Sequence, residues 1–227
     1  MTVDDRRAAW SRMTAVERRL VTRLHTPLLV QQYLNALPYN TEPSPGRATL
    51  RSFRDVTRHH TAHCLEAALF AACVLEQHGY PPLVLSFESV DELDHVIFVY
   101  CERGRWGSVA RSRDPGLHGR NPVFATPRSL AMSYVDPYID LTGGLTAYVV
   151  VSLDQLGAYD WRLSRRNVWK VENFLLNYPH HLLPVSKTRV AVWRERYRAF
   201  KATHPANKPL YYRGREKWTE IPEEFLR

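Results

Sequence analysis

The stretch HHTAHCLEAALFAACVLEQHGYPPLVL, residues 59–85, decides the fold, because it predicts a helix followed directly by a buried strand. Thr61 is a residue type that caps helices, and an alanine- and leucine-rich run follows it. Gly79 and the two prolines after it form a strong stop signal, so the predicted helix ends there. Residues 82–87 then have the length and composition of a buried strand.

Further helices and strands are predicted on both sides of this stretch. Helices are predicted over 3–24, 26–40, 126–140, 165–178 and 187–202, and strands over 95–101, 106–112 and 145–153. The segment 95–112 is predicted to form a β-hairpin, because a short turn over 102–105 separates its two apolar runs. Proline and glycine predict loops over 42–46 and 113–124. The pattern as a whole predicts an α+β fold.

Composition and charge limit the functional classes. The 227-residue chain has a formal net charge of +8, and residues 161–227 hold 15 Lys and Arg against 6 Asp and Glu. We interpret this basic tail as a solvated surface. No apolar run reaches the roughly 20 residues of a membrane span, and the first predicted helix is charged where a signal peptide is apolar. We therefore expect a cytoplasmic protein without a membrane partner.

The three cysteines, Cys64, Cys73 and Cys101, form neither a disulfide framework nor a paired zinc motif. Cys64 falls in the first turn of the predicted helix, where unpaired backbone N–H groups favour a thiolate, which is the nucleophilic form of cysteine. Cys73 comes nine residues later and points to the opposite side of that helix, so it is predicted to be a buried structural thiol.

A nucleophilic cysteine requires a base, and His95 is the best placed of the ten histidines. It opens a predicted strand just after the acidic turn at 91–94, and this strand can lie beside the helix that carries Cys64. Cys101 lies six residues further along the same strand, about 20 Å away, so it is not expected at the same site.

Two other kinds of site fit parts of the sequence. The pairs His59/His63 and His60/Cys64 have the spacing of zinc ligands on a helix, but no second ligand cluster accompanies them. Basic residues alternate with aromatic residues over 187–201 and 208–218, as they do in some nucleic-acid-binding segments. The helical period of the first segment instead favours an amphipathic helix that buries Val190, Trp193, Tyr197 and Phe200.

Four motifs resemble the core of the transglutaminase-like superfamily. They are HCLEAALFAA (63–72), HGYPP (78–82), DHVIFVY (94–100) and GRW (104–106). Papain-like proteases and peptide N-glycanases share the cysteine-histidine arrangement of this superfamily. The resemblance covers about residues 60–112. The segment RNPVFATPRSLAMSYVDPY (120–138) is also similar to bacterial transglutaminase-like proteins of unassigned activity.

The resemblance implies catalytic roles for two residues and leaves a third open. It implies that Cys64 is the nucleophile and that His95 is the general base. The family has an orienting aspartate or asparagine about four residues after the tryptophan of the hairpin, but this sequence has Ala110 there. Asp114 is the nearby candidate with the right charge. The other candidates are Ser108 and Ser112.

The sequence therefore predicts a transglutaminase-like, papain-like core with helices before it and a basic helical extension after it. We expect residues 1–153 to form the core domain and 154–227 the extension packed on it. The expected function is cysteine-dependent acyl transfer, or amide or peptide hydrolysis, on a protein, peptide or amide substrate, without a cofactor. Whether water or an amine is the acceptor stays open. The alternative is a catalytically silent binding module on the same fold.

Overall fold

The computed structural model of the chain describes residues 3–42, 48–92, 94–203 and 221–226, with side chains from Ala8 onward. It is 46% helical and 19% strand, with one antiparallel six-stranded sheet, so the α+β class is observed. The predicted loop at 42–46 and the aromatic-basic segment at 208–218 fall almost entirely outside the described residues. None of the described helices is long and apolar enough to span a membrane.

The sheet has the strand order β4-β3-β2-β1-β5-β6. Its strands are β1 (Leu83–Ser89), β2 (His95–Glu102), β3 (Arg105–Val109), β4 (Arg120–Phe124), β5 (Leu145–Ser152) and β6 (His181–Leu182). The predicted hairpin is confirmed, because β2 pairs with β3 through Cys101 opposite Trp106. The strands predicted at 82–87 and 145–153 are confirmed as β1 and β5, which pair with each other.

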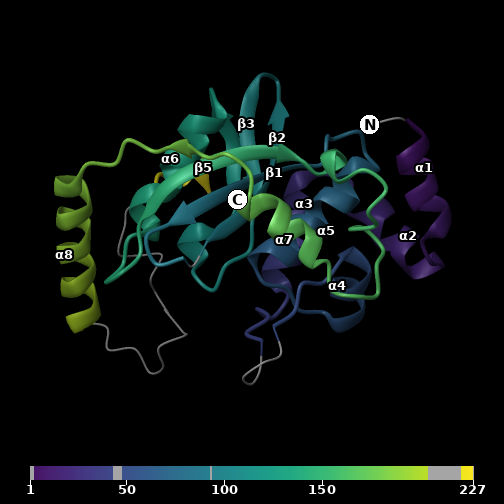
Figure 1. The fold of residues 1–227 in the computed structure, drawn as a ribbon, viewed down its shortest axis with the longest axis horizontal. Helices are drawn as coiled ribbons and strands as arrows, with labels where there is room; N and C mark the ends of the chain where they lie inside the picture. Colours follow the sequence, from purple (N-terminus) through teal and green to yellow (C-terminus); the bar gives the residue numbers. More distant parts are fainter. Residues whose placement is uncertain (1–2, 43–47, 93, 204–220, 227) are drawn as a thin grey trace.

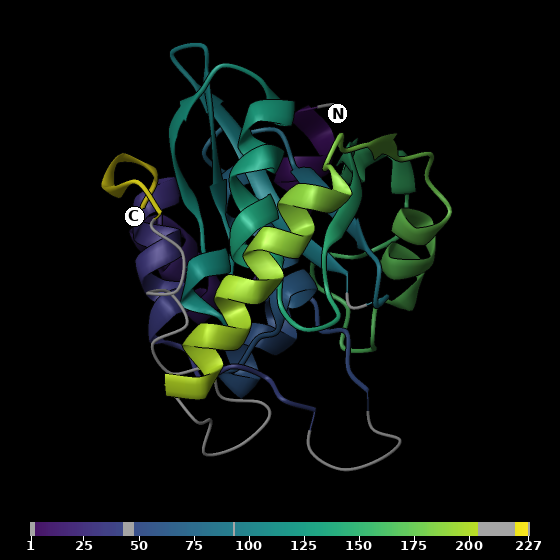
Figure 2. The same ribbon diagram turned by 90° about the vertical axis from the view of Figure 1, so that its left-hand side faces the viewer.

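Helices cover both faces of the sheet (Figure 1). They are α1 (Val3–Arg12), α2 (Ala15–Arg23), α3 (Pro27–Ala36), α4 (Phe53–His59), α5 (Cys64–Glu76), α6 (Pro127–Tyr138), α7 (Trp169–Leu176) and α8 (Lys187–Thr203), with 3-10 turns η1 (Pro115–Leu117), η2 (Leu153–Leu156) and η4 (Glu223–Phe225). Helices α3, α4 and α5 share one hydrophobic core with one face of the sheet. Helix α6 packs on the other face of the sheet, and α8 lies against α6 on that side (Figure 2).

Helix α5 is the centre of the first core. Every residue from Leu65 to Glu76 is buried, which is the expected result for a helix that is apolar on all sides. Cys73 is fully buried, as predicted. The α8 helix buries Tyr197, while Val190, Trp193 and Phe200 pack against the second core, as its helical period predicts.

The start of α5 differs from the prediction, which placed the cap at Thr61. The cap is His63, and the helix begins at Cys64. The helix starts later because Ala62 is extended and pairs with Tyr39: the N–H of Asn40 donates to the carbonyl of Ala62 at 3.1 Å. Cys64 is therefore the first residue of the helix.

Two other predictions of local structure were wrong, and one helix was missed. The helix predicted over 3–24 is two helices, because Thr14 and Glu17 form a capping box that starts α2. The loop predicted over 113–124 contains η1 and the edge strand β4. Helix α4 was not predicted; Ser52 caps it.

Candidate active site

Cys64 lines a cavity with a volume of about 500 Å³. Because Cys64 is the first helical residue, its backbone N–H has no carbonyl partner within α5. A second cavity of about 190 Å³ also reaches Cys64 and contains His95 and Asp114. The structure thus brings the three predicted site residues to one place, where the first turn of α5 meets the start of β2.

His95 is buried and held in one orientation. It is paired with Phe87 of β1, and its ring lies parallel to the Phe87 ring at a centroid distance of 6.2 Å. Its Nε2 lies 3.2 Å from the carbonyl oxygen of Leu117. A carbonyl can only accept, so Nε2 carries a proton, and Nδ1 is the nitrogen that remains for Cys64.

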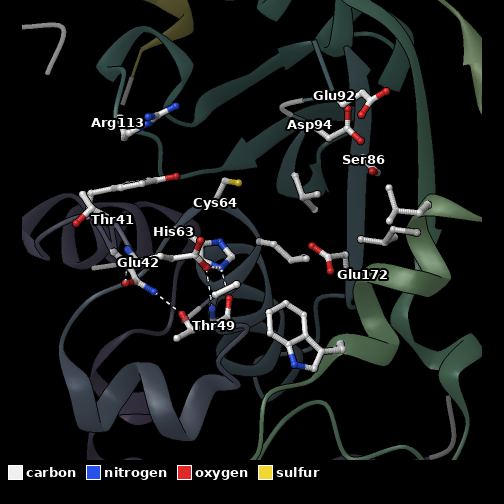
Figure 3. A pocket seen from close by; sticks show the side chains of 18 residues that line it. Thr41, Glu42, Thr49, His63, Cys64, Ser86, Glu92, Asp94, Arg113 and Glu172 are labelled. Carbon is white, nitrogen blue, oxygen red and sulfur yellow. Dashed lines mark hydrogen bonds and ion pairs between the residues drawn. The ribbon is translucent and has the colours of Figure 1, made fainter. Parts of the chain in front are cut away.

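His63, which in the sequence is only part of a candidate zinc pair, is a second imidazole at the thiol. Figure 3 shows it directly beside Cys64, with its other edge turned to Thr49. Its Nε2 lies 2.9 Å from the carbonyl oxygen of Thr49 and 3.6 Å from Oε1 of Glu66. Oε1 of Glu42 lies 3.9 Å from the same nitrogen. Every one of these partners is an acceptor, so the surroundings favour a protonated ring.

Glu66 holds this arrangement together from inside the protein. Its carboxylate is fully buried and accepts hydrogen bonds from the backbone N–H of His63 at 3.1 Å and from the Asn40 side chain at 3.0 Å. It also accepts from the Thr49 hydroxyl at 2.9 Å and from the backbone N–H of Arg51 at 3.0 Å. Glu66 is therefore a structural acid that ties the segment before α4 to the start of α5.

The two imidazoles change the ionisation of the thiol. Burial opposes ionisation of Cys64, but hydrogen bonds from His63 and His95 and the electrostatic effect of both rings outweigh it, so the pKa of Cys64 is held well below its ordinary value. Burial also opposes the charged form of His63. The hydrogen bond to Cys64 and the negative charges of Cys64 and Glu66 overcome it and raise the pKa of His63 to about 9.

The other two cysteines lack this environment. Burial, with the nearby Glu76 carboxylate, raises the pKa of Cys73 well above its ordinary value. Cys101 is exposed near the far end of β2. Of the three cysteines, only Cys64 combines a cavity, a helix start and two imidazoles.

Asp114 lines the same cavity as His95, but the acceptor at His95 Nε2 is the backbone carbonyl of Leu117. Asp114 is 3% exposed and caps η1, accepting the N–H of Gly116 at 2.9 Å through Oδ1. The same turn carries Leu117, whose carbonyl accepts from His95. Asp114 therefore shapes the turn that orients His95.

The two serines considered for this role have other partners. Ser108 Oγ contacts the Tyr134 hydroxyl at 2.7 Å and accepts the backbone N–H of Arg120 at 2.8 Å. Ser112 Oγ accepts the backbone N–H of Asp114 at 3.1 Å.

Tyr39 is a site residue that the sequence did not indicate. It lines both cavities. Burial and the negative charge of Cys64 raise the pKa of Tyr39 well above its ordinary value, although Arg113 and a hydrogen bond with the backbone of Cys64 act in the opposite direction. Its hydroxyl therefore keeps its proton beside the backbone of Cys64.

The residues considered for zinc do not form one ligand set. His59 ends α4 and His63 caps α5, so the two are not one turn apart on a single helix. His60 lies between them in a left-handed conformation, with φ of 55°. Within the described part of the chain, no group of three His, Cys, Asp or Glu side chains is arranged to hold a metal ion.

Comparison with known proteins adds no identification. No family model matches the chain, and no curated protein matches it.

Proposed function

We propose that this chain is a cysteine-dependent acyltransferase or amide hydrolase with a transglutaminase-like, papain-like core. The observation that carries the proposal is Cys64, placed at the start of a buried helix, at a cavity wall, and hydrogen-bonded by two imidazoles. Such surroundings lower the pKa of a cysteine and activate it as a nucleophile. The motifs that resemble the transglutaminase-like superfamily support the same assignment.

In the proposed acylation step, His95 holds the proton that Cys64 has lost, and the thiolate of Cys64 attacks the carbonyl carbon of an amide. The carbonyl π electrons move to oxygen, where the backbone N–H of Cys64 and the Tyr39 hydroxyl can donate hydrogen bonds. The carbon–nitrogen bond then breaks, and the leaving amine receives the proton from His95. The product is a thioester on Cys64.

In the second step, water or an amine loses a proton to His95 and attacks the thioester carbon. The carbon–sulfur bond breaks, and the thiolate of Cys64 is restored. His63 keeps its proton through both steps and stabilises the sulfur anion each time it forms. This scheme needs no cofactor.

The test uses p-nitrophenyl acetate, a small activated ester that acylates reactive thiols without specific recognition. We expect one acetyl group on Cys64 by peptide mass spectrometry and a matching burst of p-nitrophenol, both lost in Cys64→Ala. His95→Gln should lower the acylation rate at least about 100-fold, because a positioned base contributes 10²–10⁴-fold. His181→Gln is the matched control, since His181 is exposed on β6.

The comparison of Cys64 with Cys101 gives the result that would contradict the proposal. If Cys64 is acetylated no faster than the exposed Cys101, the enzyme assignment is wrong. The catalytically silent binding module on the same fold would then be the better description.

A further inference from the structure

The cavity at Cys64 is acidic, although the chain as a whole has a net charge of +8. Four carboxylates line the 500 Å³ cavity: Glu42, Glu92, Asp94 and Glu172. Arg113 is the guanidinium that lines it. Figure 3 shows Glu92, Asp94 and Glu172 on one side of Cys64 and Arg113 on the other.

One of these carboxylates, Glu42, lies 3.9 Å from Nε2 of the protonated His63, and the other three are not neutralised by a Lys or Arg within the described part of the chain. No Lys or Arg there forms an ion pair with Glu92, Asp94 or Glu172. Burial raises the pKa of Glu172, the positive charge of His63 lowers it, and the negative charges of Glu42 and Cys64 raise it. Glu172 therefore interacts electrostatically with His63, Glu42 and Cys64 across the cavity.

Helix α7 adds apolar surface to the same cavity. Trp169, Glu172 and Leu176 are three and seven residues apart, so they lie along one face of the helix. All three line the cavity. Trp169 is 37% exposed and Leu176 is 58% exposed, so both present apolar surface at the cavity. The carboxylate of Glu172 thus lies between the exposed apolar side chains of Trp169 and Leu176.

We propose that this cavity binds a basic peptide segment, in which a Lys or Arg side chain lies against Glu172 and Asp94 and an apolar neighbour lies against Trp169 and Leu176. The inference rests on the proposed function, since the bound segment would supply the carbonyl that Cys64 attacks. A cleft lined by charges of one sign raises the local concentration of the opposite charge and the rate at which it arrives. These carboxylates repel a negatively charged amide, and they give an uncharged amide no attraction between opposite charges.

The first experiment compares two thiol reagents of opposite charge. The trimethylammonioethyl and sulfonatoethyl methanethiosulfonates each form a disulfide with the thiolate and release methanesulfinate. Rates at Cys64 and at the exposed Cys101 are measured by peptide mass spectrometry. At low salt, the cation-to-anion rate ratio at Cys64 should exceed the ratio at Cys101 by about tenfold or more. In about 0.5 M salt this excess should shrink, because charges are strongly screened at that salt concentration.

Matched variants locate the effect. Glu172→Gln and Glu92→Gln should each lower the ratio at Cys64 about two- to threefold, because each removes one of the charges that attract the cation. Glu92 is exposed, so its variant does not depend on interior packing. Glu195→Gln is the control, because Glu195 is exposed on α8 and pairs with Arg198.

A second probe tests the peptide directly. An acetylated, amidated Phe-Arg-Ala peptide should slow iodoacetamide labelling of Cys64, and its citrulline twin, which lacks only the charge, should require about tenfold more peptide for the same protection. Trp169→Ala should weaken protection by both peptides.

The outcomes separate the two proposals. An inert Cys64 would refute the enzyme assignment and this inference with it. A reactive Cys64 that shows no preference for the cationic reagent, or equal protection by both peptides, would overturn the basic-peptide inference alone.

Discussion

The substitution His63→Asn isolates the contribution of the second imidazole. Asparagine is a favourable helix cap, so the start of α5 should be retained while the positive charge is lost. The surroundings raise the pKa of His63 from 6.5 to about 9, which corresponds to about 3.4 kcal/mol in favour of its charged form. The thiolate of Cys64 contributes to this preference together with Glu66 and the Thr49 carbonyl.

The coupling between two ionisable groups is reciprocal, so the thiolate gains from His63 what His63 gains from the thiolate. If a third to a half of the preference belongs to Cys64, the thiolate loses about 1–1.7 kcal/mol in the variant, or about tenfold in its population. We therefore expect His63→Asn to label with iodoacetamide about tenfold more slowly at pH 6, with a smaller difference as the pH approaches 9.

The assay follows labelling of each cysteine by peptide mass spectrometry between pH 5 and pH 9. Cys101 serves as the internal reference, and His59→Asn, at the exposed end of α4, serves as the matched variant. A pH profile for His63→Asn that coincides with that of the unaltered protein would refute the pairing of His63 with the thiolate.

Three further predictions test the surroundings of the site. Burial, and then the charge of Arg111, lower the pKa of His118 to about 4, so the unfolded chain takes up this proton first as the pH falls. The free energy of unfolding should therefore decrease by up to about 3 kcal/mol between pH 6.5 and pH 4, and urea titrations of His118→Gln should show less of this decrease. Asp114→Asn still accepts the N–H of Gly116, so acetylation of Cys64 should stay within about threefold, whereas Asp114→Ala should lose at least tenfold; equal losses would show that the charge itself matters. Phe70→Ala should lower the free energy of unfolding by about 3–5 kcal/mol in urea, since the ring is fully buried, and a loss below 1 kcal/mol would contradict the packing of α5.

The elements that the sequence predicted are those with strong local signals. Helix α5 and the hairpin β2–β3 have stop residues, apolar runs and a tight turn within their own segments. The strand β4 contains Pro122 and lies at the sheet edge, where pairing with β3 outweighs its weak propensity. The cap of α5 was misplaced because the pairing of Ala62 with Tyr39 joins segments 23 residues apart in the sequence.

The site also contains residues that the sequence could indicate and residues that it could not. Cys64 and His95 could be chosen from helix and strand periodicity, since each stands at the start of its own element. The carbonyl of Leu117 could not, because any residue supplies a carbonyl and only the path of the chain places it. The position of Tyr39 likewise depends on a contact between distant segments, which no local pattern encodes.

The absence of an aspartate at position 110 of the hairpin and the presence of His63 at the thiol are linked by electrostatics. In the pattern that the sequence resembles, a carboxylate orients the histidine and also stabilises its positive charge. Here a neutral carbonyl orients His95, so it fixes the ring but supplies no negative charge. The buried carboxylate of Glu66 lies instead beside His63, where it favours the cation that faces Cys64. The buried carboxylate thus supports the imidazole at the helix cap, which stabilises the thiolate together with His95. This arrangement requires a mild effect of Asp114→Asn together with a large effect of His63→Asn on the reactivity of Cys64. If Asp114→Asn were the more damaging change, the thiolate would depend mainly on His95.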